Sequence, residues 1–317
     1  MKQYLSIDIG GTFIKYALLT ESGEFSERDK KSTPATKEEF LKLLEGLIET
    51  YHPYISGVCI ACPGSIQTKT GYVRSGGLIP YLKAIPLGSY LSECSGLPVT
   101  VLNDADAAGL AEAISGNLVQ SYCGAALVLG TGVGLALVSE GQLTNLAQLQ
   151  AKGLLTRPLS HFKEGEEGNI LQNLGHILDL NWRGIRSLVA NSGSAVRFIT
   201  QASYRLGLET EDGPEVFARL SAGTDVELTN LFSQYCQEIA YLILNLRILF
   251  QLDKLVIGGG ISNQILLIDH INIAYQKVIS NEGVPSTFLD SPLITSCHYH
   301  NDANIIGALY FHLQETA

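Results

Sequence analysis

Two glycines stand between an acid and a threonine at residues 8–12, which read Asp-Ile-Gly-Gly-Thr and lie between two apolar, strand-like runs. Because Gly10 and Gly11 lack a Cβ atom and tolerate positive φ, the backbone amides of such a turn can converge on an anion. Thr12 adds a hydroxyl donor, and Lys15 adds a nearby positive charge. These residue types predict a phosphate-binding hairpin, although a plain tight turn between two strands would have the same composition.

Asp8, at the end of the first of these runs, has the wrong charge for direct contact with a phosphate. Carboxylates hold Mg²⁺ directly or through water, and the ion then accompanies the phosphates. Asp8 is therefore predicted to hold Mg²⁺, and the alternative is a surface acid in the turn.

Two further glycine clusters follow strand-like runs. Residues 129–134 read Leu-Gly-Thr-Gly-Val-Gly, and residues 258–262 read Gly-Gly-Gly-Ile-Ser. The three clusters lie more than a hundred residues apart along the chain. This spacing predicts two related halves that serve one nucleotide.

The segment Asn103-Asp104-Ala105-Asp106 follows the strand-like run Val99–Leu102 and opens a helical pattern. A carboxylate at the end of a strand and the start of a helix is well placed to contact a ligand. Asp104 could accept the proton of a hydroxyl group as its oxygen attacks a phosphoryl group. Asn103 or Asp104 could instead simply cap the helix, and both interpretations stay open at this point.

Length and composition limit the class of protein. The chain has 317 residues, enough for two domains, and only 16% are charged, which leaves much of it available for burial. Lys and Arg total 21 against 31 Asp and Glu, a net charge of −10 that argues against sequence-independent binding to nucleic acid. The chain starts directly on a strand pattern, and its apolar stretches are too short or too glycine-rich to cross a membrane, so a cytoplasmic protein is expected.

The six cysteines lie mostly in apolar patterns and are expected to be buried free thiols. Cys59 and Cys62 form a C-x-x-C pair, but no second pair completes a zinc site. Strand alternation would also turn these two side chains to opposite faces.

Periodicity predicts an alternation of strands and helices, which is typical of an α/β fold. The expected strands are 4–9, 13–20, 57–61, 99–103 and 254–257. The expected helices are 37–51, 87–95, 104–114, 185–206, 214–222, 225–251 and 265–278, with a last helix from about residue 302. Residues 142–182 are polar and irregular and are expected to form a long loop.

Taken in order, these motifs resemble those of the ROK family of sugar kinases and related repressors, in the sugar kinase/actin/Hsp70 ATPase superfamily. Ala61–Ile66, followed by Gly71 and Val73, is similar to the family's A-x-P-G-x-[VI] hairpin, and Gly307-Ala308 is similar to its C-terminal helix signature. The resemblance covers almost the whole chain.

The resemblance implies an α/β, actin-like (ribonuclease H-like) two-domain ATPase fold with a nucleotide cleft between the domains. It implies an N-terminal domain of residues 1–108 plus 304–317 and a larger C-terminal domain of residues 109–303. It also implies ATP and Mg²⁺, a small sugar substrate and a homodimer. The acidic charge balance and the short apolar stretches, by contrast, are what argue against a nucleic-acid or membrane partner.

The resemblance further assigns roles to individual residues. Asp104 is the expected general base. The other expected site residues are Asn103, Gly64 and Asp106 for the sugar, Gly10, Gly11, Thr12, Lys15, Gly130, Thr131 and Gly132 for the phosphates, Gly259 and Gly260 for the adenosine, and Asp8 for Mg²⁺.

The chain departs from the family where many members carry E-x-G-H and a C-x-C-G-x-x-G-C zinc cluster. Counting from the second glycine cluster, that position falls near residues 153–156, where neither acid nor histidine occurs. No structural zinc is therefore expected. Glu164, Glu166 or Glu167 could replace the missing sugar-binding Glu, and His161 or His176 could contact the substrate. Otherwise the sugar is unusual, such as a β-glucoside, or efficient catalysis has been lost.

Three hypotheses follow. The first is ATP-dependent phosphorylation of a hydroxyl of a hexose or hexose derivative. The second is a weakly catalytic or non-catalytic sugar or nucleotide sensor without a DNA-binding domain, because only seven residues precede Asp8. The third is a relative that hydrolyses ATP without a sugar.

Overall fold

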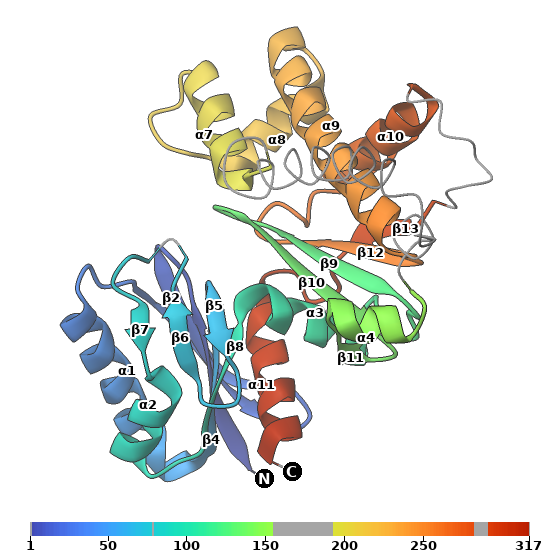
Figure 1. Ribbon diagram of the computed structural model, residues 1–317. Helices are drawn as coiled ribbons and strands as arrows, with labels where there is room; N and C mark the ends of the chain where they lie inside the picture. The colour runs from blue at the N-terminus through green and yellow to red at the C-terminus, as the bar shows by residue number, and fades with distance from the viewer. Residues whose placement is uncertain (1, 78, 155–192, 282–290, 317) are drawn as a thin grey trace. The chain divides into compact units, whose positions relative to one another are not determined.

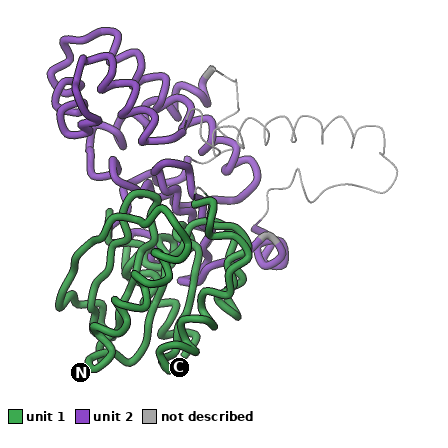
Figure 2. The backbone as a smooth tube through the Cα atoms, turned by 90° about the vertical axis from the view of Figure 1, so that its left-hand side faces the viewer, with its two compact units in different colours: residues 1–116, 301–317 green, residues 117–300 purple. Residues whose placement is uncertain are grey.

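The computed structural model describes residues 2–77, 79–154, 193–281 and 291–316. The chain forms two compact units, which Figure 2 shows in different colours. The first unit comprises residues 1–116 together with 301–317, and the second comprises residues 117–300. The first unit is thus built from two separate stretches of chain.

A five-stranded mixed sheet with the strand order β3-β2-β1-β4-β8 forms the centre of the first unit (Figure 1). Strands β1, β2 and β3 are antiparallel, and β4 and β8 run parallel to β1. The elements of this unit are β1 (Gln3–Ile9), β2 (Phe13–Thr20), β3 (Phe25–Ser32), α1 (Lys37–Tyr51), β4 (Ile55–Cys62), β5 (Ser65–Gln67), β6 (Tyr72–Ser75), β7 (Lys83–Ile85), α2 (Leu87–Ser95), β8 (Val99–Asn103), α3 (Asp104–Ser115) and α11 (Ala303–Thr316).

The second unit repeats this arrangement with the strand order β11-β10-β9-β12-β13. Its first strands form an antiparallel hairpin, and β12 and β13 run parallel to β9. The elements are β9 (Gly124–Leu129), β10 (Val133–Ser139), β11 (Gln142–Leu143), α4 (Leu146–Ala151), α7 (Ala195–Arg205), α8 (Gly213–Ala222), α9 (Val226–Leu249), β12 (Lys254–Gly258), α10 (Ile265–Asn281) and β13 (Leu293–Ser296). The common strand order agrees with the two related halves predicted from the glycine clusters.

Strand alternation determines what β1 presents on each face of its sheet. Leu5, Ile7 and Ile9 join the apolar core that includes Phe40 of α1. Ser6 points to the other face, where its hydroxyl donates to the carbonyl oxygen of Ile305 in α11 at 2.7 Å. The two helices therefore cover opposite faces of the same sheet.

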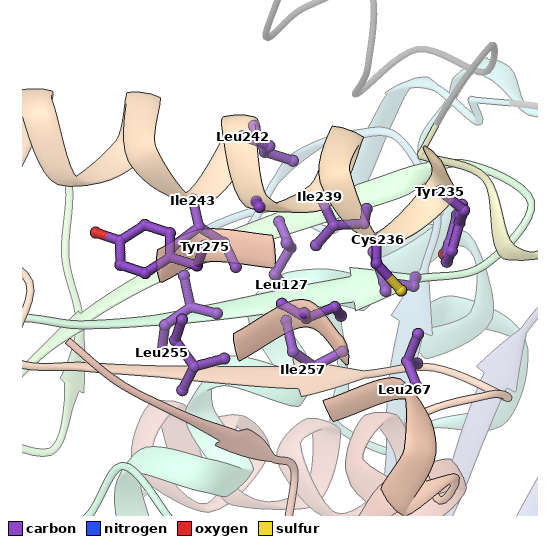
Figure 3. Close-up of a cluster of buried hydrophobic side chains, with 14 of the residues drawn as sticks. Leu127, Tyr235, Cys236, Ile239, Leu242, Ile243, Leu255, Ile257, Leu267 and Tyr275 are labelled. Atoms are coloured by element: carbon purple, nitrogen blue, oxygen red, sulfur yellow. The ribbon is translucent and has the colours of Figure 1, made fainter. Parts of the chain in front are cut away.

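A second core lies under the long helix α9, as Figure 3 shows. Ile239 and Ile243 of this helix pack with Leu127 of β9 and Leu255 of β12, and Tyr275 of α10 is fully buried in the same cluster. Burying each such side chain contributes about 1.5–3 kcal/mol relative to leaving it exposed. This core gives the glycine turns at the ends of β9 and β12 a rigid base.

The helices and strands agree with most of the predicted ones, with two corrections. The expected loop 142–182 was wrong at its start, because residues 142–143 form β11 and residues 146–151 form α4. The expected helix 185–206 was wrong around Ser194, because the helix α7 begins only at Ala195. Ser194 has an extended backbone and is the N-cap, and its side chain accepts from the amide of Arg197 at 3.1 Å. Residues 155–192 lie outside the described part of the chain.

The cysteines fit the predicted pattern of free thiols. All six are in the described residues, none is in a disulfide, and only Cys94 is exposed. Among the helices that the structure describes, none has the length and apolar character needed to cross a bilayer.

Helix α11 approaches α3 so closely at Gly307 that a side chain has no room. A Cβ atom at Gly307 would overlap the carbonyl oxygen of Ala107. Because the obstructing atom belongs to the backbone of a helix, it cannot move aside as the end of a flexible side chain could. Gly307 is therefore required for the packing of α11 in the first unit.

We expect Gly307→Ala to destabilise the protein by about 1–3 kcal/mol, the range of a forced overpacking. Gly46→Ala is the matched control, because Gly46 lies in α1 and an added Cβ would meet nothing within 4 Å. That control should be neutral or stabilising by up to about 1 kcal/mol through helix propensity. Urea unfolding of both variants measures the difference, and equal stabilities would contradict the packing account.

Candidate functional site

The first glycine hairpin joins β1 to β2 in the first unit. The amide of Gly10 donates to the carbonyl oxygen of Phe13 at 3.0 Å and closes the turn. This amide is therefore used internally, and the amides of Gly11 and Thr12 remain the candidates for an anion. Gly11 is exposed, and an added Cβ there would meet nothing within 4 Å, so there is open space beside this part of the turn.

Thr33, which follows β3, also stabilises the hairpin. Its amide donates to the carbonyl oxygen of Thr12 at 2.9 Å, and its hydroxyl donates to the carbonyl oxygen of Gly10 at 2.6 Å. Sequence reasoning missed this residue, since a lone threonine after a polar segment carries no signal. Thr33 thus fixes the carbonyl groups of Gly10 and Thr12. Because a peptide group is planar, the N–H groups of Gly11 and Phe13, which belong to the same two peptides, are fixed in direction as well.

Asp8 is 6% exposed at the end of β1 and has two donors. One carboxylate oxygen accepts from Nδ2 of Asn304 at 3.0 Å, and the other lies 3.5 Å from Nζ of Lys15. Asn304 is 296 residues away in the chain, and the sequence analysis did not identify it. These contacts fix the orientation of the Asp8 carboxylate in the absence of a ligand.

The start of α3 is organised by Asn103. Its side-chain oxygen accepts from the amides of Ala105 at 2.9 Å and Asp106 at 3.2 Å, so Asn103 is the N-cap. Its Nδ2 donates to the carbonyl oxygen of Gly64 at 2.8 Å. The capping interpretation is therefore correct for Asn103, whose side chain also hydrogen-bonds to the neighbouring Asp104.

Asp104 is the first residue of α3 and is partly buried. Burial raises the pKa of Asp104, and the negative charge of Asp8 raises it further, while the hydrogen bond from the amide of Ala105 opposes the shift. The pKa of the Cys62 thiol, raised chiefly by burial, also responds to both Asp104 and Asp8. Two carboxylates thus lie close enough to influence one another, which favours a cation or a proton beside them.

Asp106 lies two residues after Asp104 in the first turn of α3. Burial, together with the charge of Asp104, raises its pKa to about 6. Asp106 is therefore a partly buried carboxylate held next to another of the same sign, an arrangement that is common at functional sites.

The second glycine hairpin lies between β9 and β10 in the second unit. The amide of Gly130 donates to the carbonyl oxygen of Gly132 at 2.9 Å, so the amides of Thr131 and Gly132 remain the candidates for a phosphate. The carbonyl oxygen of Gly130 accepts from the hydroxyl of Ser194 at 3.2 Å and from the amide of Val196 at 3.4 Å. The first turn of α7 therefore supports this hairpin, a role for Ser194 that the sequence analysis did not find.

The third glycine cluster follows β12 and contacts the second hairpin within the same unit. Gly259 has φ of +95°, and a Cβ atom there would overlap the carbonyl oxygen of Leu129, so only glycine fits. The carbonyl oxygen of Gly259 accepts from the amide and the hydroxyl of Ser262, at 3.1 and 2.8 Å. Gly260 is exposed, and an added Cβ there would meet nothing within 4 Å, which leaves room for a ligand.

The predicted site residues are thus divided between the two units. The first unit contains Asp8, Gly10, Gly11, Thr12, Lys15, Gly64, Asn103, Asp104 and Asp106, and the second contains Gly130, Thr131, Gly132, Gly259 and Gly260. Glu164, Glu166, Glu167, His161 and His176 lie outside the described residues.

The residues of the first unit fit a magnesium ion that arrives with phosphates. Mg²⁺ commonly takes one or two carboxylates and completes its shell with phosphate oxygens and water. Asp8 supplies such a carboxylate in a fixed orientation. Over residues 2–77, 79–154, 193–281 and 291–316, no three His, Cys, Asp or Glu side chains form a group that could hold a metal by themselves.

The fold and motifs have counterparts among known proteins. The ROK family model matches residues 4–145. A β-glucoside kinase of Klebsiella pneumoniae is 26% identical over 96% of this chain and 94% of its own length, and an N-acetylmannosamine kinase of Citrobacter koseri is 27% identical over 96% of each. A ROK family glucokinase from Streptomyces griseus, solved with glucose and AMPPNP, superposes with a TM-score of 0.70 at 19% identity, covering 98% of this chain and 99% of that one.

These comparisons agree with the order of motifs along the chain. The ROK family model matches residues 4–145, and the chain has the actin-like ATPase fold of solved ROK sugar kinases. The predicted resemblance to the ROK family and the predicted fold are both confirmed.

The raised pKa of Asp106 has a consequence for stability. A carboxyl whose pKa is higher in the folded state than in the unfolded state favours folding below its ordinary pKa of 3.8, and this contribution is lost as the pH rises through about 6. Above pH 6, ionised Asp106 costs up to about 3 kcal/mol. We therefore expect Asp106→Asn to raise the melting temperature at pH 8 and to leave it nearly unchanged at pH 4.

Thermal unfolding across this pH range measures the effect. Asp269→Asn, at an exposed position in α10, is the matched control and should shift the two melting temperatures equally. A variant at Asp106 that is less stable than the wild type at pH 8 would show that its charge is compensated by a favourable contact.

Proposed function

We propose that the protein is an ATP-dependent sugar kinase that phosphorylates a hydroxyl group of a hexose or hexose derivative, with Asp104 as the general base. The coarser part of this proposal, a kinase that acts on a sugar, is supported by the relatives named β-glucoside kinase and N-acetylmannosamine kinase. The observation that carries the assignment of the base is the environment of Asp104.

Asp104 has the properties that proton transfer from an alcohol requires. Its pKa is raised by burial and by Asp8, so its ionised form is a stronger base than an ordinary aspartate. Asn103 caps the helix from the preceding position and fixes the backbone from which Asp104 projects. In the proposed reaction, Asp104 accepts the hydroxyl proton as the sugar oxygen bonds to the transferred phosphoryl group.

The other proposed roles follow the chemistry of each group. Asp8 would hold Mg²⁺, which neutralises charge on the phosphates when it is bound with ATP. The amides of Gly11 and Thr12 in the first unit, and of Thr131 and Gly132 in the second, are assigned to phosphate oxygens. The open side of Gly260 is assigned to the adenosine, and Asn103, Gly64 and Asp106 are assigned to the sugar.

Replacing Asp104 by Asn tests the base. The variant keeps the size and the helix start but cannot accept a proton, so we expect the turnover number to fall by about 10²–10⁴-fold. ATP affinity, measured by isothermal titration calorimetry, should change little. The melting temperature should not fall, because a buried charge has been removed. Turnover equal to that of the wild type would defeat the assignment.

The substrate class is tested by coupled ADP release with MgATP and a panel of sugars. The panel contains glucose, mannose, fructose, allose, N-acetylmannosamine and β-glucosides such as cellobiose. We expect one class to raise ADP release well above the rate without sugar, and the names of the relatives place β-glucosides and N-acetylmannosamine first. If ATP binds but no sugar stimulates ADP release, the protein is a sensor or has lost catalysis.

A further inference from the structure

Three charged side chains form one row across the sheet of the first unit. Asp8 of β1 is paired with Lys15 of β2, and Lys15 is paired with Lys30 of β3. Directly opposed residues project to the same face, with Cβ atoms about 4.5–5.5 Å apart. The row therefore contains two positive charges and one negative charge.

The negative charge compensates only one of the two lysines. Nζ of Lys15 lies 3.5 Å from the Asp8 carboxylate. Nζ of Lys30 lies 4.4 Å from the ring centroid of Phe13, a cation–π contact that orients the ammonium group without neutralising it. Like charges directly opposite one another destabilise a sheet, so this pair costs stability until an anion binds beside it.

The next cation on the same face is already compensated. Strand alternation places Arg28 two residues before Lys30, and its guanidinium lies 3.4 Å from the carboxylate of Asp302. Lysines on an edge strand also discourage pairing with other chains, but that role does not require Lys30 to stand opposite Lys15.

The row adjoins the first glycine hairpin. Phe13, against which Lys30 packs, is the residue after Thr12. Thr33, three residues after Lys30, binds the carbonyl oxygens of Gly10 and Thr12. The end of β3 is thus fastened to the turn whose amides are assigned to phosphate.

We propose that Lys30, together with Lys15, forms an additional anion-binding element that contacts the phosphate chain of the phosphoryl donor. This inference rests on the proposed function of the first hairpin. Lys30 then acts with the backbone amides in selecting a polyphosphorylated donor. The bound phosphates offset the repulsion between the two lysines.

Lys30→Gln tests the proposal, with Lys31→Gln as the matched control. Lys31 is the next residue of the same strand but projects to the opposite face, where it is paired with Ile14 and lies 3.9 Å from Asp29. Isothermal titration calorimetry with ATP, inorganic tripolyphosphate, adenosine and glucose 6-phosphate separates the possible sources of the anion. Thermal melts verify that both variants fold.

We expect Lys30→Gln to weaken binding of ATP and tripolyphosphate by about fivefold, the upper range for one exposed charge pair, and to reduce the salt dependence of both. Adenosine binding should not change, and Lys31→Gln should resemble the wild type. Equal losses in the two variants would overturn the proposal in favour of a general charge effect. A loss confined to glucose 6-phosphate, or a wild type that does not bind tripolyphosphate, would also overturn it.

The proposal and the proposed function fail in different ways. If the wild type shows sugar-dependent ADP release and Lys30→Gln binds ATP normally, the kinase assignment stands and the role of Lys30 is wrong. If no sugar is phosphorylated but Lys30→Gln still weakens tripolyphosphate selectively, the lysine pair binds phosphate chains and the kinase assignment is wrong.

Discussion

The approach of α11 to α3 at Gly307 is the contact on which the first unit depends. A helix backbone can come this close to another only where no side chain intervenes, and Gly307 meets the Ala107 carbonyl directly. The first turn of the same helix contains Asn304, which donates to Asp8, and Ile305, whose carbonyl oxygen accepts from the hydroxyl of Ser6. The orientation of a proposed ligand for Mg²⁺ is thus determined by packing at the far end of the chain.

The carboxylates of the first unit show a compromise between stability and reactivity. Burial raises the pKa of Asp104 and Asp106, and each also feels a neighbouring negative charge. An exposed aspartate would cost less stability but would be a weaker base. Proteins commonly accept such strain at functional sites and offset it in apolar cores such as the one beneath α1.

Periodic apolar residues made much of the fold predictable. Helices 37–51 and 87–95 were predicted with the bounds that the structure has, because their buried faces repeat at helical spacing. Strand β3 was missed because its eight residues are all exposed and show no alternation, so only its pairing with β2 defines it. Helix α4 was missed because it has six residues and depends on a capping box at Asn145.

The site was predictable where the chemistry lies in contiguous residues. The glycine turns and the segment Asn103–Asp106 could be read directly, since their residue types and order carry the signal. Asn304, Thr33 and Ser194 could not, because each acts through contacts with backbone or carboxylate atoms that lie elsewhere in the chain. A single sequence contains no information about which distant side chain will reach such an atom.

The discontinuous first unit also bears on how the chain folds during synthesis. Residues 117–300 form one continuous stretch and can fold in the order in which they are made. The first unit cannot be completed until residues 301–317 have been made. At about 5–20 residues per second, the ribosome needs roughly ten to forty seconds to make the intervening segment. Until then, the sheet face that α11 will cover is open to water and to chaperones, although β1 is made before the second unit. The first unit is therefore begun before the second and completed after it.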